Sequence, residues 1–154
     1  FGESRDAETI RAMSIEAETG VAVYSTVHTN SVAETLSRMA REFPQNERDA
    51  MAASLISAMR LIVHQRLLKK PGGEGRIAVR EWLVFDGEVR SALESEPLER
   101  LIPATRELLE KRKTRLIDDL VRKYESGVID RREFEDFRLA LGASHDTEKG
   151  GSNE

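Results

Sequence analysis

Residues 1–31 read FGESRD (1–6), AETIRAMSIEAETG (7–20) and VAVYSTVHTNS (21–31), and this stretch decides the fold. Asp6 is a good N-cap for a helix that ends at Gly20. Residues 21–27 are mostly β-branched, aromatic or apolar, which predicts a buried strand of a parallel sheet. His28 follows this strand, at the edge where ligands bind in open α/β sheets. Glu3, Arg5 and Asp6 are expected at the end of a preceding strand, of which Phe1 is the last residue.

The composition indicates a globular chain with an extended charged surface. The 154 residues fit one domain or a large part of one, with 39% hydrophobic and 34% charged residues. The net charge of −4 argues against a dedicated nucleic-acid binder. There is no cysteine and hence no disulfide. No apolar run is long enough to span a membrane, and no signal peptide opens the chain. Because the first residue is Phe1, we expect a carboxyl-terminal piece of a longer protein.

The rest of the chain alternates helical patterns with one hairpin pattern. The expected elements are helices over 31–43, 46–63, 87–95 and 104–126, strands over 65–70 and 76–85, and a last helix that Asp130 caps. Either Asn30 or Ser31 is expected to cap the first of these helices, and Asp86 is the expected cap of the helix over 87–95. We expect Pro97 and Pro103 to frame a break before the long charged helix.

Three strings in the opening stretch match one known family at its own spacing. They are Gly2-Glu3-x-Arg5-Asp6-x-Glu8-Thr9, Ala17-Glu18-Thr19-Gly20 and Ser25-Thr26-Val27-His28-Thr29-Asn30. The hairpin strings Gln65–Lys70 and Gly75–Glu81 also match. Together they resemble the secretion-superfamily ATPases, which include the pilus-retraction ATPases of the PilT type, the type II secretion ATPases and the DotB/TraJ ATPases of type IVB secretion. The strings AETIRA (7–12) and VHTNSVAETL (27–36) are similar to the DotB/TraJ branch.

This resemblance implies an α/β fold class, the C-terminal part of a RecA-like P-loop ATPase domain followed by a helical region. Residues 1–97 would hold the Walker B segment, the histidine box and the β-hairpin. Residues 98–142 would form the helical C-terminal region, and 143–154 a disordered tail. No phosphate loop ending in Gly-Lys-Ser or Gly-Lys-Thr occurs in the sequence. We therefore expect that loop upstream of Phe1, and no activity from these residues alone.

The resemblance also implies roles for five side chains. Glu3 stands at the Walker B glutamate, where a carboxylate can hold Mg²⁺ or polarise the attacking water; the alternative is a solvated acid at a helix start. His28 stands in the histidine box, near the γ-phosphate, and the alternative is a structural histidine. Arg5 either pairs locally with Asp6 or faces the nucleotide or a neighbouring subunit. Thr26 and Thr29 are further candidates at the nucleotide.

The function that the resemblance implies is a cytoplasmic homo-hexameric ATPase that uses ATP and Mg²⁺ to power a type IV secretion system, Dot/Icm-like or conjugative. It would associate peripherally with the inner membrane through secretion-system components, without a transmembrane segment or a nucleic-acid partner. One alternative is a pilus-retraction ATPase of the PilT type. Another is a non-catalytic helical docking module from about Leu98 onward, if the phosphate loop is absent. A nucleic-acid translocase shares the RecA-like architecture, but the acidic balance opposes it.

Overall fold

A computed structural model describes the backbone of residues 2–149 and the side chains of residues 2–142. Within these bounds the chain forms two compact units. The first holds residues 2–64 and 82–112, and the second holds 65–81 and 113–149. Phe1, the expected strand end, and residues 150–154 of the expected tail lie outside the described residues. The domain limits expected after residues 97 and 142 stay predictions.

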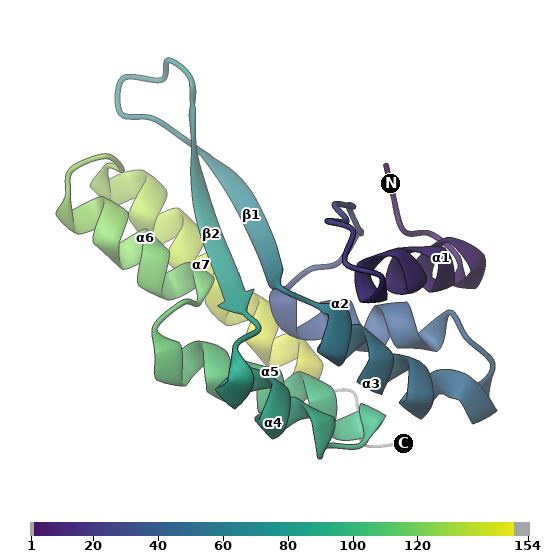
Figure 1. Ribbon diagram of the computed structural model, residues 1–154. Coiled ribbons are helices and arrows are strands. Elements are labelled where there is room, and N and C mark those ends of the chain that lie inside the picture. Colours follow the sequence, from purple (N-terminus) through teal and green to yellow (C-terminus); the bar gives the residue numbers. More distant parts are fainter. Residues whose placement is uncertain (1, 150–154) are drawn as a thin grey trace. The chain divides into compact units, whose positions relative to one another are not determined.

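The first unit is helical (Figure 1). Its elements are α1 (Ala7–Glu18), α2 (Val32–Arg41), a 3₁₀ turn η1 (Gln45–Glu47), α3 (Arg48–Ala58), α4 (Gly87–Glu94) and α5 (Leu98–Arg112). The expected caps are confirmed. The side chains of Asp6, Ser31 and Asp86 each accept the backbone N–H three residues ahead, at 2.8, 3.3 and 3.0 Å. Such caps satisfy backbone donors that a helix start leaves without an intrahelical partner.

Helix α2 lies at the centre of the first unit's core and packs against both α3 and α5. Val32, Leu36, Met39 and Ala40 on α2 are all buried. Burying one such large apolar side chain contributes about 1.5–3 kcal/mol to folding. Phe43, just after α2, is 1% exposed and lies under the Arg11 guanidinium, 5.1 Å from its ring centre. The helix that follows His28 is therefore firmly held.

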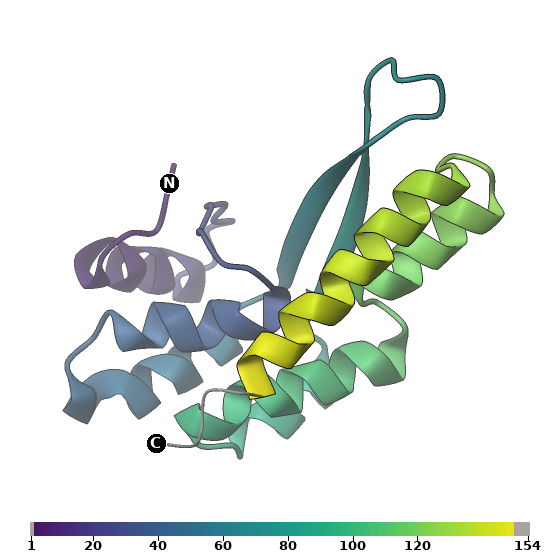
Figure 2. The same cartoon turned by 180° about the vertical axis from the view of Figure 1, so that it is seen from behind.

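The second unit combines the outer part of a β-hairpin with two helices. Strands β1 (Leu61–Lys69) and β2 (Arg76–Val84) pair in a two-stranded sheet, and α6 (Leu116–Glu125) and α7 (Arg131–Lys149) lie side by side (Figure 2). Leu68, Val79, Leu116, Leu120 and Ile129 form a separate core. Two carboxylates dock the helices on strand backbone: Asp119 accepts the Arg80 N–H at 2.8 Å and Glu133 accepts the Lys69 N–H at 2.9 Å.

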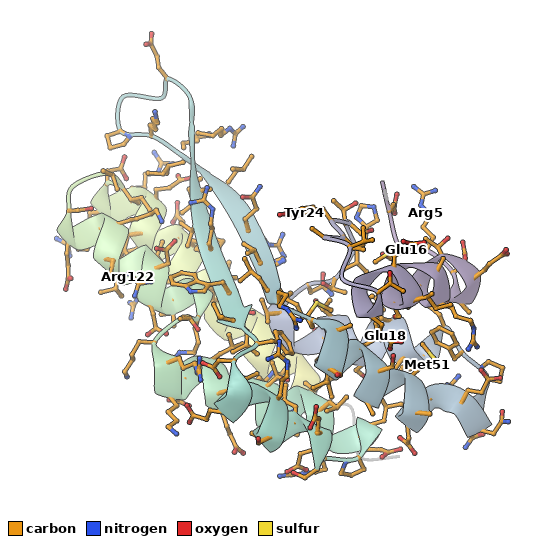
Figure 3. The ribbon with its side chains drawn as sticks, in the orientation of Figure 1. Arg5, Glu16, Glu18, Tyr24, Met51 and Arg122 are labelled. Carbon is orange, nitrogen blue, oxygen red and sulfur yellow. The ribbon has the colours of Figure 1, made fainter. Side chains whose placement is uncertain are left out.

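The strand predicted over residues 21–27 is wrong. This segment is an irregular loop, with Val21 51% and Tyr24 83% exposed (Figure 3). A strand needs a ladder of backbone hydrogen bonds with a neighbour. In the described chain, β1 and β2 pair with each other. The loop shares a single backbone–backbone hydrogen bond with the opening segment, from the Ser4 N–H to the Thr26 carbonyl. The composition of 21–27 favours a strand, but the described residues provide no ladder.

The helices predicted over 46–63 and 104–126 are wrong at their ends. Helix α3 stops at Ala58 because Met59 turns to extended backbone, and the β-branched Ile62 and Val63 join β1. The long helix is two helices, α5 and α6, separated at Lys113, whose φ is 57°. Helix α6 begins where the Asp118 side chain accepts a hydrogen bond from the Arg115 backbone N–H at 3.0 Å.

Two further expectations need correction near the helix limits. Pro103 lies inside α5 instead of framing its start; a proline at such a position removes one helical donor and crowds the carbonyl of the preceding turn. Helix α7 continues to Lys149, so residues 143–149, expected in a disordered tail, belong to a helix.

Candidate functional site

Two segments that flank α1 meet at the candidate site. The Ser4 N–H donates to the Thr26 carbonyl at 2.8 Å, and the Thr26 hydroxyl donates to the Gly2 carbonyl at 2.7 Å. The hydroxyls of Ser4 and Ser25 lie 2.8 Å apart, and Ser4 is buried. These bonds hold Glu3 beside Val27 and His28. Glu3 precedes α1 and His28 follows it in the sequence, and the bonds bring the two residues together.

Glu3 is the centre of a three-residue cluster. Its Oε2 lies 2.5 Å from Nη2 of Arg5, and its Oε1 lies 2.9 Å from Nε2 of His28. The Glu3 side chain is 23% exposed, whereas those of Arg5 and His28 are 74% and 83% exposed. One carboxylate therefore holds two exposed donors at the protein surface. The structure brings together the three residues that the sequence analysis placed at the catalytic edge, while their roles stay predictions.

The charges of this cluster act on one another. The Arg5 guanidinium, through its hydrogen bond and its charge, is the main reason that the pKa of Glu3 lies below its usual value, and His28 adds to this. Glu3 in turn raises the pKa of Arg5. Asp6 does not take part, because its carboxylate caps α1, and the Thr9 N–H lowers the pKa of Asp6. The local ion pair considered between Arg5 and Asp6 is replaced by the pair between Arg5 and Glu3.

A hollow of about 270 Å³ opens beside the cluster. Its lining combines the three clustered side chains with apolar walls and two more charges on or just after α2; these further residues are Ser4, Ile10, Val27, Arg38, Met39 and Glu42. All of them belong to the first unit. A hollow with several charged groups and apolar walls is the kind of place where a small polar ligand binds.

The structure does not bring Thr26 and Thr29 into this cluster in the same way. The Thr26 hydroxyl is occupied by the Gly2 carbonyl, so it holds the two segments together. Thr29 lies past His28, and its hydroxyl is 3.0 Å from that of Thr35 in the first turn of α2. Neither threonine lines the hollow. Their assignment to the nucleotide stays a prediction.

The residues at the hollow could supply only a small share of the ligands of a magnesium ion. Among the described residues, no group of three or more His, Cys, Asp or Glu could hold a metal. Mg²⁺ bound with a nucleotide needs only one or two protein carboxylates, because phosphates and water complete its shell. Glu3, the less exposed of the two carboxylates at the hollow, is suited to that part.

Sequence reasoning missed the residues that support this site. The hydroxyls of the buried Ser4 and the exposed Ser25 contact each other, and Arg38 lines the hollow from α2. Glu18 accepts a hydrogen bond from Ser54 at 2.8 Å and so ties α1 to α3 (Figure 3). The one sequence signal that could have indicated Ser4 and Ser25 is that they are adjacent to the candidate residues Glu3 and Thr26. No spacing distinguishes Arg38 from Arg41 on the same helix.

The family model for "Type II/IV secretion system protein" matches residues 1–135. The chain belongs to this family. It is 35% identical over 103 residues to the type IV pilus retraction ATPase PilT of Pseudomonas aeruginosa, which covers 67% of this chain and 30% of that protein. The family assignment made from the sequence is thereby confirmed.

Solved structures of the family show the same fold. The ATPase DotB of Legionella pneumophila matches with a TM-score of 0.82 and 37% identity, over 90% of this chain and 37% of that one. The pilus retraction motor PilT with bound ADP matches with a TM-score of 0.74 and 30% identity, over 88% and 37%. The expected fold class, part of a RecA-like ATPase domain followed by a helical region, is confirmed.

The chain spans about a third of the length of the relatives it matches, 30% of the Pseudomonas aeruginosa PilT and 37% of the DotB chain. No helix within the described residues has the length and hydrophobicity to cross a membrane.

Proposed function

We propose that the intact protein hydrolyses ATP, as a homo-hexamer, to power a type IV secretion system of the Dot/Icm-like or conjugative kind. One observation carries the proposal: Glu3 lies within hydrogen-bond distance of both Arg5 and His28, beside a hollow. A carboxylate that can position water and a guanidinium that can meet the charge on the phosphate are two of the parts that phosphoryl transfer to water uses, and an imidazole can donate a hydrogen bond to a phosphate oxygen. The family membership supplies the nucleotide, since DotB and PilT are both named as ATPases.

Glu3 is the proposed base that orients and polarises the attacking water. A carboxylate does this best when it is ionised and has a free oxygen lone pair directed at the water. In the described structure both carboxylate oxygens are engaged, one by Arg5 and one by His28. Phosphate oxygens in the hollow offer these two donors a second anion. Their transfer from Glu3 to the phosphate would leave the carboxylate available to the water.

His28 is the proposed sensor of the nucleotide state. Its side chain is 83% exposed and is held on one side by Glu3, so it can exchange partners without disturbing the core. A contact that exists with the γ-phosphate and not after its release has a different free energy in the two states. Such a difference is what a conformational switch requires.

Mg²⁺ is the proposed metal of the reaction, and when bound it would neutralise charge on the phosphates. From the described residues Glu3 would face it, directly or through water. The secretion-system components at the cytoplasmic face of the inner membrane are the proposed partners. The pairing of Glu3 with Arg5 and His28 forms within this chain, without these partners.

A second candidate function is pilus retraction, favoured by the 35% identity to the Pseudomonas aeruginosa PilT. The DotB structure is the better match of the two described above in both TM-score and identity. We therefore place secretion first. Deletion of the full gene separates the two: loss of protein or DNA transfer supports secretion, and loss of twitching motility with intact transfer supports retraction.

The proposed activity is tested by phosphate release from ATP with the purified full-length protein. We expect turnover that requires Mg²⁺, stops on chelation and rises when hexamers form at higher protein concentration. The particle size should be measured on the same sample by light scattering. Absence of turnover in a folded hexamer, alone and with the secretion-system components, would contradict an ATPase.

A further inference from the structure

The hollow beside Glu3 contains a cation that the cluster does not use. Arg38 on α2 lines the hollow and is exposed. In the part of the chain that the structure describes, Arg38 forms no ion pair, whereas Arg5 and His28 are both bound by Glu3. The hollow therefore has one positive charge that is not neutralised by a protein carboxylate in contact with it.

The chemistry of Arg38 selects the kind of ligand. A guanidinium stays charged at any physiological pH and presents several N–H donors in a planar fork. That fork matches the oxygens of a carboxylate or a phosphate. The hollow also has apolar walls, at Ile10, Val27 and Met39.

The hollow is large enough for a phosphate together with water. Its volume is about 270 Å³, and one water molecule occupies about 30 Å³ in the liquid. Glu42, just after α2 and one turn beyond Arg38, also lines the hollow and opposes an anion. It is exposed, so solvent and salt screen much of this repulsion.

We propose that Arg38 is a phosphate-binding residue of this hollow. It binds the terminal phosphate of the nucleotide before hydrolysis and the released inorganic phosphate afterwards. Helix α2 begins shortly after His28 and is held by the core, and both Arg38 and His28 line the hollow. The identity of the nucleotide rests on the proposed function; the affinity of Arg38 for phosphate does not.

The kinetic test compares three variants of the full-length protein. We expect Arg38→Ala to raise both the KM for ATP and the inhibition constant of inorganic phosphate by about 10- to 100-fold, the usual effect of losing a hydrogen bond between charged groups. Arg38→Lys keeps the charge and should recover part of this loss. Arg41→Ala, on the same helix and exposed but away from the hollow, should behave as wild type. Thermal unfolding should be the same for all, because the Arg38 side chain makes no hydrogen bond or ion pair with another of the described residues.

The binding test separates this inference from the proposed function. Inorganic phosphate is titrated by calorimetry into the full-length protein, with and without ADP, so that turnover is not needed. Loss of phosphate binding in Arg38→Ala but not in Arg41→Ala supports the role of Arg38, even if ATP is not hydrolysed. If inorganic phosphate binds only when ADP is present, Arg38 serves the position of the nucleotide's terminal phosphate. If phosphate binds in both samples, the hollow is a site for free phosphate. Equal phosphate binding by wild type and Arg38→Ala, or none by wild type, would overturn it.

Discussion

Nε2 of His28 lies 2.9 Å from Oε1 of Glu3, although all of α1 and an irregular loop separate the two residues in the sequence. The contact depends on the short pairing between residues 2–4 and 25–27, which the contact between the Ser4 and Ser25 hydroxyls supports. The carboxylate and the imidazole thus lie where each can respond to an anion that enters the adjacent hollow.

His28→Ala should slow ATP hydrolysis and uncouple it from transport without unfolding the protein. The imidazole is 83% exposed, so its removal leaves no cavity. Thermal unfolding and ATPase rate should be measured on the same full-length sample. A large fall in melting temperature with normal activity per folded molecule would show that His28 is a structural residue.

Arg5→Ala should move the acid limb of the ATPase pH profile to higher pH. Arg5 is the main cause of the lowered pKa of Glu3. Without Arg5 that pKa rises, and the carboxylate is ionised only at higher pH. The measurement is kcat/KM against pH for full-length wild type, Arg5→Ala and Arg41→Ala, the last as a control for lost charge. An acid limb that stays in place in Arg5→Ala would exclude Glu3 as the titrating base.

Asp86→Asn should lower the melting temperature at pH 7, and the difference from wild type should shrink in acid. Asp86 caps α4 and pairs with Arg112 at 2.7 Å, and Arg112 is the main cause of its pKa of about 2, below the usual 3.8. Because the pKa of Asp86 is lower in the folded chain than in the unfolded chain, the ionised carboxylate stabilises the fold at any pH above the unfolded pKa. This contribution to stability is complete above about pH 4 and is lost as the pH falls toward about 2.

The controls for Asp86 separate capping from ion pairing. Asp86→Ala removes both the cap and the charge and should lower the melting temperature further, because asparagine still caps a helix and alanine does not. Asp130→Asn changes a cap that has no arginine partner among the described residues and should have little effect. An equal loss in Asp86→Asn at pH 7 and pH 3 would argue against the ion pair.

The 154 residues alone should bind ATP weakly or not at all. The sequence contains no Gly-Lys-Ser or Gly-Lys-Thr string, and backbone N–H groups of that loop supply most donors to the phosphates in P-loop proteins. A calorimetric titration of this chain, beside the full-length protein, measures the difference. Micromolar affinity of the isolated chain would refute the expectation.

Local signals predicted local structure well. The caps Asp6, Ser31 and Asp86 could be recognised because an N-cap acts on a backbone N–H only three residues away. The hairpin between Lys69 and Arg76 could be recognised from its glycines, of which Gly72, Gly73 and Gly75 have positive φ. The cluster of Glu3, Arg5 and His28 was expected from family spacing, and the structure brings it together.

Features that depend on distant partners could not be predicted. The composition of residues 21–27 is that of a strand, but strand formation needs a neighbouring strand, which composition does not reveal. Similarly, nothing near Lys113 indicates that the chain leaves one core there and enters another. Arg38 and Arg41 are equivalent by sequence, and only the fold shows that Arg38 lines the hollow.

The central claim is that Glu3 is the base for ATP hydrolysis, and turnover of Glu3→Gln in the full-length protein tests it most directly. Glutamine keeps the shape and removes the negative charge and the basicity. Glu16→Gln is the matched control, because Glu16 is an exposed acid of α1 (Figure 3) that does not line the hollow. We predict a fall in kcat of about 10²- to 10⁴-fold for Glu3→Gln with ATP binding retained, and wild-type turnover for Glu16→Gln. Wild-type turnover by Glu3→Gln would contradict the account.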